Sequence, residues 1–593
     1  MAPNKSGPSL SHALEALGEV KIANFSQAQL QNQSFVSKWF QGKLRPFLAA
    51  PSRNFLVCLS SRNFSCQTYR IVIQALSSQM ASMDRETQRA VFTHFIYPFL
   101  ARNDSSDPGC VSNISGSREW LQTNFGNFSG FATLQDLQTL NPNFSSADAL
   151  SLLTPTQVAQ LTLSSGALND TDLIEVVFVR LEQGNALENV DEFLRQLTAN
   201  GEVPDIQPVV RDLVMNRTFT IISPHFPGFE RQDWFAWFHV ILIPVLPSFS
   251  PVMLRSATSN INCTNYHVMV DGLSNTFNRM TPARREEMAQ VLLAYLRESA
   301  TQINTPACRG GIDSDAEWIA ANLGPFSVHT TYTDLTFFNI TGVTVLDSLS
   351  PNQKAELILE PNNLSNETLV RLVFTQLVEP SDVEELGSFF DKFVSGAAEQ
   401  KLTSIDPGVR DTIFNLTLTA LAPQLSTLDV EGFRLWFQVY LPLFLPSIQA
   451  GTFEIIPRDI SCGSYQEIVK GCDNVFTDLS ERQTREVFAF TRNYLGDQTS
   501  TGFSCVESVN DDRDWLRKNF GQFRIRASFI DFVTLKNNFN GVEVADLLTQ
   551  VQLAQLSTIP SQLKGMQDVT KIMTAISPVD FGSFFDIVSP AIE

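Results

Sequence analysis

The sequence predicts an all-α fold: a right-handed superhelix, or solenoid, of short helices of the armadillo-like kind, arranged as three repeats. The main observation is that one stretch occurs three times at a spacing of about 198 residues. It reads "WLQTNFGNFSGF" from Trp120, "WIAANLGPFSVH" from Trp318 and "WLRKNFGQFRIR" from Trp515. Helix-start signals recur with the same period, and strand signals are scarce. Short helices in such a series usually stack on one another.

The repeats are predicted to cover residues 1–204, 205–403 and 404–593. Two tryptophan positions and two cysteine positions recur in each of them. Trp39, Trp237 and Trp436 correspond to one another, and each is followed by phenylalanine. Because they recur inside apolar runs, we expect all three indoles to be buried.

Local signals predict where several helices begin and end. We expect the helix that carries Trp120 and its counterparts to be about two turns long, with N-caps at Ser117, Asp315 and Asp512 and glycine ends at Gly126, Gly324 and Gly521. Capping boxes of the S/T-x-x-Q type predict three further helix starts, at Thr154, Ser350 and Thr549. A third set of starts is predicted at Asp84, Thr281 and Ser480.

The stretch from Trp234 to Leu254 is nearly as apolar and as long as a membrane span. It contains His239 and three prolines, and the matching segment of the first repeat holds three basic residues. Charged side chains are costly in lipid. The sequence therefore favours a buried helix that ends at the prolines, and no transmembrane segment is expected in this fragment.

Six of the eight cysteines recur in pairs that would close loops of 44, 45 and 43 residues. The second repeat has only Cys263 and Cys308, so a bond within that repeat is the economical solution. Copying it to the other repeats predicts Cys66–Cys110 and Cys462–Cys505, each worth about 4 kcal/mol on the chain-entropy model. We expect Cys472 to act as a small buried side chain, whereas Cys58 would pair outside this fragment or stay free.

The chain contains 15 N-x-S/T acceptor sites, a pattern with meaning only on the secretory route. They are Asn4, Asn24, Asn32, Asn63, Asn103, Asn113, Asn127, Asn143, Asn169, Asn216, Asn262, Asn339, Asn363, Asn366 and Asn415. The first residues hold no apolar signal-peptide core, so the chain is interpreted as a mature or trimmed fragment of an extracellular or cell-surface protein. Nine sites fall in the first repeat, five in the second and one in the third.

Charge and motifs argue against several classes of function. With 62 carboxylates against 42 Lys and Arg, the net charge of −20 disfavours nucleic acids and anionic membranes as partners. The six histidines do not stand at metal-ligand spacing, and nucleophile elbows and phosphate loops are absent. We therefore predict a non-enzymatic protein without cofactor, metal or catalytic residues. An alternative is a secreted carrier that holds a small apolar ligand in a cavity lined by some of its 46 phenylalanines.

Three segments of about 40 residues, of which the first is "NFGNFSGFATLQDLQTLNPNFSSADALSLLTPTQVAQLTL", resemble the mesothelin, stereocilin and otoancorin family. The resemblance rests on an N-F-G-x-F opening and an L-x-x-L-[ST]-P-x-Q-x-A-x-L end. It implies an all-α superhelix and an extracellular glycoprotein that attaches cells to one another or to an overlying gel. Members are often lipid-anchored, but this chain ends at "FDIVSPAIE" without a hydrophobic tail. Because the third repeat holds only one acceptor, we expect it to be the docking end; its partner would be an extracellular protein or glycoprotein, a second copy of the chain or the missing C-terminal part of the parent protein.

Overall fold

The computed structural model describes residues 8–301, 307–379, 382–500 and 505–593. The predicted fold class is confirmed: these residues form many short helices and no strand. The chain divides into two compact units, one of Met1–Leu296 with Ala321–Phe326 and one of Arg297–Ala320 with Ser327–Glu593. The boundary between the units falls inside the second predicted repeat, so units and repeats divide the chain differently.

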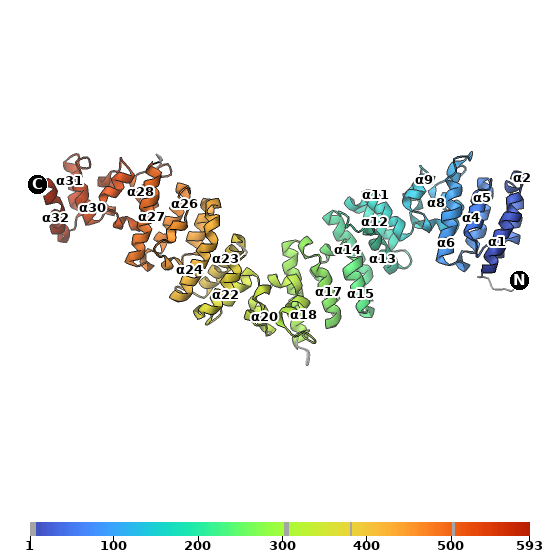
Figure 1. The fold of residues 1–593 in the computed structure, drawn as a ribbon, viewed down its shortest axis with the longest axis horizontal. Coiled ribbons are helices and arrows are strands. Elements are labelled where there is room, and N and C mark those ends of the chain that lie inside the picture. Colours follow the sequence, from blue (N-terminus) through green and yellow to red (C-terminus); the bar gives the residue numbers. More distant parts are fainter. Residues whose placement is uncertain (1–7, 302–306, 380–381, 501–504) are drawn as a thin grey trace. The chain divides into compact units, whose positions relative to one another are not determined.

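The helices of the first half pack on their neighbours in the chain (Figure 1). They are α1 (Pro8–Val20), α2 (Gln27–Leu30), α3 (Gln33–Ser37), α4 (Arg53–Ser60), α5 (Cys66–Ser78), α6 (Arg85–Val91), α7 (Tyr97–Leu100), α8 (Ser117–Phe125), α9 (Leu134–Leu140), α10 (Ser146–Ala149), α11 (Pro155–Ser164), α12 (Thr171–Leu181), α13 (Ala186–Leu197), α14 (Pro208–Ile222), α15 (Arg231–Ala236), α16 (Pro251–Thr258) and α17 (Cys263–Ser274).

The second half follows the same plan. Its helices are α18 (Pro282–Thr301), α19 (Asp315–Asn322), α20 (Tyr332–Phe337), α21 (Pro351–Leu359), α22 (Glu367–Val378), α23 (Val383–Glu399), α24 (Pro407–Leu421), α25 (Val430–Arg434), α26 (Cys462–Asn474), α27 (Glu481–Ser500), α28 (Asp512–Phe520), α29 (Phe529–Leu535), α30 (Gln550–Ser557), α31 (Met566–Ala575) and α32 (Phe581–Ile592). Short 3-10 turns connect many of them.

A π-helix carries the recurring Trp-Phe pair at all three places: η2 (Lys38–Lys43), η11 (Trp237–Ile241) and η18 (Leu435–Tyr440). In each, the tryptophan carbonyl accepts a hydrogen bond from the N–H five residues on, at 2.8, 2.9 and 3.0 Å. Such π turns are rare and are usually kept for a structural or functional reason. Trp237 and Trp436 are buried as predicted, but the prediction is wrong for Trp39, which is only half-buried.

Most of the apolar stretch at Trp234–Leu254 is buried, although Phe235 and Val252 are exposed, and it is not one helix. It runs through the end of α15, the π-helix η11, a 3-10 turn at η12 (Leu246–Ser248) and the start of α16. Proline lacks the N–H that a continuing helix needs, and three prolines divide the segment. Within the described chain, no single helix is long and apolar enough to cross a membrane. Helix α31 and residues 578–592 reach the necessary length and apolar character only when taken together, and the chain bends by 99° between them.

Most predicted helix starts are confirmed. Thr154, Ser350 and Thr549 each form a complete capping box. Asp84, Thr281 and Ser480 accept a hydrogen bond from the backbone N–H three residues on. Gly126, Gly324 and Gly521 end their helices with φ of 52°, 51° and 51°, a region that favours glycine. In addition, a Cβ on Gly126 would lie only 2.0 Å from the Ser77 hydroxyl.

Candidate functional site

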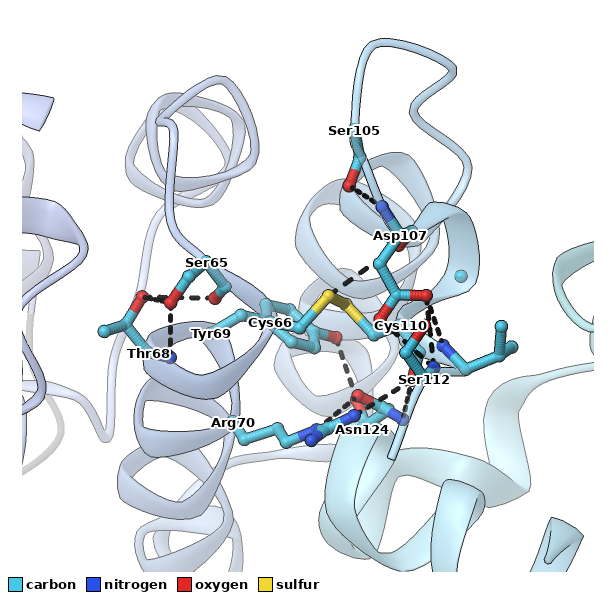
Figure 2. Close-up of a disulfide and its surroundings, with 12 residues drawn as sticks. Ser65, Cys66, Thr68, Tyr69, Arg70, Ser105, Asp107, Cys110, Ser112 and Asn124 are labelled. Carbon is cyan, nitrogen blue, oxygen red and sulfur yellow. Dashed lines mark hydrogen bonds between the residues drawn. A yellow bond between two sulfur atoms is a disulfide. The ribbon is translucent and has the colours of Figure 1, made fainter. Parts of the chain in front are cut away.

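The first disulfide, Cys66–Cys110, joins the first residue of α5 to the end of a 3-10 turn at η6 (Pro108–Cys110), with Cα atoms 5.5 Å apart (Figure 2). The matching bond Cys462–Cys505 has a Cα–Cα distance of 5.4 Å. Cys263 and Cys308 are the other bonded cysteines, so the chain has three disulfides. Cys58 and Cys472 are free, and Cys472 is buried as predicted.

The second cysteine of each pair has a left-handed backbone, with φ of 53° at Cys110, 58° at Cys308 and 54° at Cys505. L-residues other than glycine rarely adopt such angles, and they persist where the surroundings impose them. The same unusual conformation therefore recurs at the three places where a loop returns to a cysteine.

A buried polar cluster lies under the first disulfide (Figure 2). The Tyr69 hydroxyl donates to the Asn124 carbonyl oxygen at 2.8 Å, and the Trp120 indole N–H donates to the Gly109 carbonyl oxygen at 2.8 Å. Arg70 Nη2 donates to the Cys110 carbonyl oxygen at 2.9 Å. Burial raises the pKa of the Tyr69 phenol well above its usual value. We call these residues, with Cys66, the disulfide cluster.

The same bonds recur in the other copies. Tyr266 and Tyr465 donate to the carbonyl oxygens of Asn322 and Asn519, each at 2.6 Å. Sequence reasoning missed these tyrosine–asparagine pairs. A signal for them was available, because both residue types recur at the repeat period.

The predicted N-caps Ser117, Asp315 and Asp512 are wrong by one residue. Each is the first helical residue, and the cap position is Gly116, Ser314 or Asp511. The side chains of these three residues instead accept a hydrogen bond from a backbone N–H that is distant in the sequence. The Ser145 N–H donates to Ser117 at 2.7 Å, the Thr341 N–H to Asp315 at 3.1 Å and the Asn540 N–H to Asp512 at 2.9 Å. They hold a later loop against the helix start, a role that local patterns do not reveal.

The glutamine of each capping box has a second use. Gln353 Nε2 donates to the carbonyl oxygens of Ser327 at 2.6 Å and Thr330 at 2.7 Å, while its Oε1 caps α21. Gln157 and Gln552 make the equivalent bonds. These buried amides tie each capped helix to the turn before it.

The predicted glycan acceptors lie at the surface. Thirteen of their side chains are exposed, Asn363 is half-buried, and Asn4 lies outside the described residues. Asn32, Asn262 and Asn366 are N-caps that accept through Oδ1. Because an N-glycan is attached to Nδ2, this capping bond leaves the attachment atom available.

Two acceptor sites lie inside long helices, Asn216 in α14 and Asn415 in α24. The threonines of these two sites, Thr218 and Thr417, are fully buried. Their Oγ1 atoms have no hydrogen-bond partner among the described residues. A buried hydroxyl without a partner is unfavourable, so packing alone does not account for threonine here.

One acceptor position can be compared directly across the repeats, just before the first cysteine of each pair. The residues there are Asn63, Asn260 and Asp459, and all three are exposed. Only Asn63 is an acceptor, because Asn260 is followed by Ile-Asn and the third copy has aspartate.

The third repeat also differs in shape beside that position. Where the first two repeats have α4 and α16, the third has only a 3-10 turn at η20 (Thr452–Ile455). An open groove of about 370 Å³ lies there, lined in part by Phe453, Phe490 and Arg458. Acidic and amide side chains complete its wall, so it can take both apolar and polar contacts.

No group of three or more His, Cys, Asp or Glu side chains within the described residues is placed to hold a metal ion. A mainly apolar cavity between Phe414 and Phe437 measures about 10 Å³, which is at most room for one water. Phe374, Phe389 and Phe390 pack together in the core with ring centroids 4.9–6.1 Å apart.

Comparisons with known proteins found no family model, no curated protein and no solved structure that matches this chain.

Proposed function

We propose that this chain belongs to an extracellular, non-enzymatic glycoprotein that attaches cells to one another or to a matrix or gel, and that it binds its partner through the third repeat. The observation that carries the proposal is the distribution of acceptor asparagines. Thirteen of the fourteen described acceptors are exposed, all acceptors but Asn415 lie in the first two repeats, and none lies in residues 416–593. A glycan is bulky and solvated, so a contact surface must be free of it.

Three further observations support the proposal. Three disulfides are compatible with an oxidising, extracellular location. The resemblance of the three 40-residue segments to the mesothelin, stereocilin and otoancorin family implies attachment as the role. The groove beside Asp459 gives the third repeat a concave surface with aromatic and charged walls.

The test places a glycan at this groove. Asp459→Asn creates an Asn-Ile-Ser acceptor whose serine, Ser461, caps α26 as Ser65 caps α5 after the Asn63 acceptor. The fold should therefore accept the glycan. We expect a glycosylated Asp459→Asn protein to attach to cells or gel at least about tenfold more weakly than the parent, because a glycan excludes the partner.

A matched control is available in the second repeat. Asn262→Ser removes that acceptor and makes Asn260 one, at the same place in the repeat and with serine as the helix cap. Attachment by this variant should equal that of the parent. Equal attachment by glycosylated Asp459→Asn, or equal loss in both variants, would reject the third repeat as the contact surface.

A further inference from the structure

The second and third repeats meet through an aromatic junction in the second unit. Phe390 of α23 has its ring centroid 5.7 Å from Trp436, 6.3 Å from Tyr440 and 5.7 Å from Phe444. These three partners stand at four-residue intervals along and just after the π-helix η18. The Phe390 side chain is fully buried, at 0% exposure. We call this arrangement the repeat junction.

The first and second repeats meet in the first unit through the corresponding elements, with leucines in α13. Helix α13 packs on the π-helix η11. It also packs on α14, which lies next to it in Figure 1. Leu194 and Leu197 of α13 are buried. Trp237 begins η11 and is buried as well. At both places, therefore, the last helix of one repeat packs on the Trp-Phe segment of the next.

The last helix of the third repeat carries the first half of another such junction. Gly-Ser-Phe-Phe-Asp occurs in α23 at 387–391 and again in α32 at 582–586. By this match Phe585 corresponds to Phe390 and Ile592 to Ala397. Phe585 is 47% exposed and Ile592 is 78% exposed, whereas Ala397 is 2% exposed. Phe585, Asp586 and Ile592 are here named the tail.

The Trp-Phe segment of the first repeat carries the second half. "WFQGKLRPFL" from Trp39 matches "WFQVYLPLFL" from Trp436. Lys43 and Phe47 therefore correspond to Tyr440 and Phe444. Trp39 and Phe47 are half-buried, and Lys43 is exposed with its Nζ 4.6 Å from the Trp39 ring centroid. These three residues are here named the head.

Charge makes the head and the tail complementary. In the built junction, burial and then a hydrogen bond to Asp391 raise the pKa of the Tyr440 phenol. The head has Lys43 in place of that tyrosine, and the tail has Asp586 in place of Asp391. The Lys43 ammonium can therefore form an ion pair with the Asp586 carboxylate. This pair would take the place of the hydrogen bond between Tyr440 and Asp391 in the built junction.

We infer that the tail of one copy of this chain binds the head of a second copy, which repeats the internal junction between molecules. Phe585 would pack against Trp39 and Phe47, and Asp586 would pair with Lys43. A head-to-tail contact of this kind joins two different surfaces, so it can continue into a row of molecules rather than close as a two-fold dimer. The inference extends the proposed function by naming a partner, and it rests on the internal junctions rather than on the attachment role.

Two acceptors lie near the head and must not block it. Asn24 follows α1, and Asn32 caps α3. The counterparts of α3, namely α15 and α25, pack on α17 and α26 of their own repeats. The glycan at Asn32 therefore sits beside the head, on a segment whose counterparts pack within their own repeats.

Sedimentation velocity over a range of concentrations tests the inference on the glycosylated chain. The parent should show species larger than the monomer that grow with concentration. Phe585→Asp should weaken this association at least about tenfold, because it places a charge in the contact. Phe585 is exposed, so the melting temperature should stay unchanged. Val252→Asp, at a 68% exposed valine of α16, is the matched control and should associate like the parent.

A charge exchange tests the orientation. Lys43→Asp alone sets two carboxylates against each other, and Asp586→Lys alone sets two ammonium groups against each other. Each variant should therefore stay monomeric. When the two variants are mixed in equal amounts, every head-to-tail contact between unlike variants pairs an aspartate with a lysine. Species larger than the monomer should then return.

Three results would overturn the inference: a parent that remains monomeric, association that survives Phe585→Asp, or mixed charge variants that stay apart. Failure here is distinct from failure of the proposed function. A monomeric parent that still attaches to cells, and loses attachment when Asp459→Asn is glycosylated, would remove self-association and leave the attachment role in place.

Discussion

Replacing Thr218 by valine should stabilise the protein, although most changes in a buried helix do the opposite. Thr218 lies in α14 with 0% exposure, and its Oγ1 has no partner among the described residues. Burying such a hydroxyl costs about 1–3 kcal/mol. Valine has the same β-branched shape and a similar helix propensity. The free energy of unfolding of Thr218→Val should therefore rise by about 1–3 kcal/mol.

The assay must separate the hydroxyl from the glycan, because the change also removes the Asn216 acceptor. Both proteins should carry Asn216→Gln, so that neither is glycosylated at that residue. Urea unfolding followed by tryptophan fluorescence then compares the two midpoints. Thr417 occupies the matching position of α24 and gives an independent repeat of the experiment.

Thr162 is the control. It is also fully buried in a helix, but its Oγ1 donates to the Val158 carbonyl oxygen at 2.8 Å. Thr162→Val should lose about 0.5–1.5 kcal/mol, the net worth of one hydrogen bond. If Thr218→Val loses as much as Thr162→Val, then Thr218 has a partner and the reasoning fails. A gain would indicate that the threonine is kept for the acceptor site rather than for packing.

Trp237→Ala should reduce the free energy of unfolding by about 3–5 kcal/mol, the range for a large aromatic side chain in a core. Trp39→Ala should reduce it clearly less, because Trp39 is only half-buried. Equal losses for the two variants in urea unfolding would contradict this. Burial raises the pKa of the Cys472 thiol to about 12, so native protein at pH 9 should resist alkylation there while unfolded protein reacts. The raised pKa also means that the contribution of Cys472 to stability is complete below pH 9 and is lost as the pH approaches about 12. Non-reducing peptide mapping should link Cys263 to Cys308, and a link from either to a cysteine of another repeat would refute intra-repeat bonding.

Features that depend on neighbours in the sequence were predictable. A capping box involves residues three positions apart, so Ser350 and Gln353 could be recognised from the sequence alone. The long-range half of the same glutamine's role, its bonds to Ser327 and Thr330, could not. The N-cap of α28 was misplaced for a related reason: Asp511 and Asp512 are both suitable caps, and only the fold shows that Asp512 holds Asn540.

Repetition in a sequence also has a limit as a guide to structure. Trp39 matches Trp237 and Trp436 in sequence, yet it is less buried, because its counterparts are covered partly by the preceding repeat. Equal residues predict equal surroundings only where the neighbours recur too. The exposed acceptor asparagines could be identified from the sequence, but the orphan hydroxyls of Thr218 and Thr417 needed the packing around them.

The disulfides also set how far the chain can be stretched. A protein that attaches a cell to something else carries tension, and a helical solenoid under tension lengthens as its helices unravel. The loops closed by Cys66–Cys110 and Cys462–Cys505, with sequence separations of 44 and 43, cannot take part, because the covalent bond carries the force past them. Fully extended, each loop would add about 150 Å at about 3.5 Å per residue. Reduction would release that length one loop at a time, so in the attachment role proposed above the oxidation state of the cysteines would set how far the chain extends before it becomes taut.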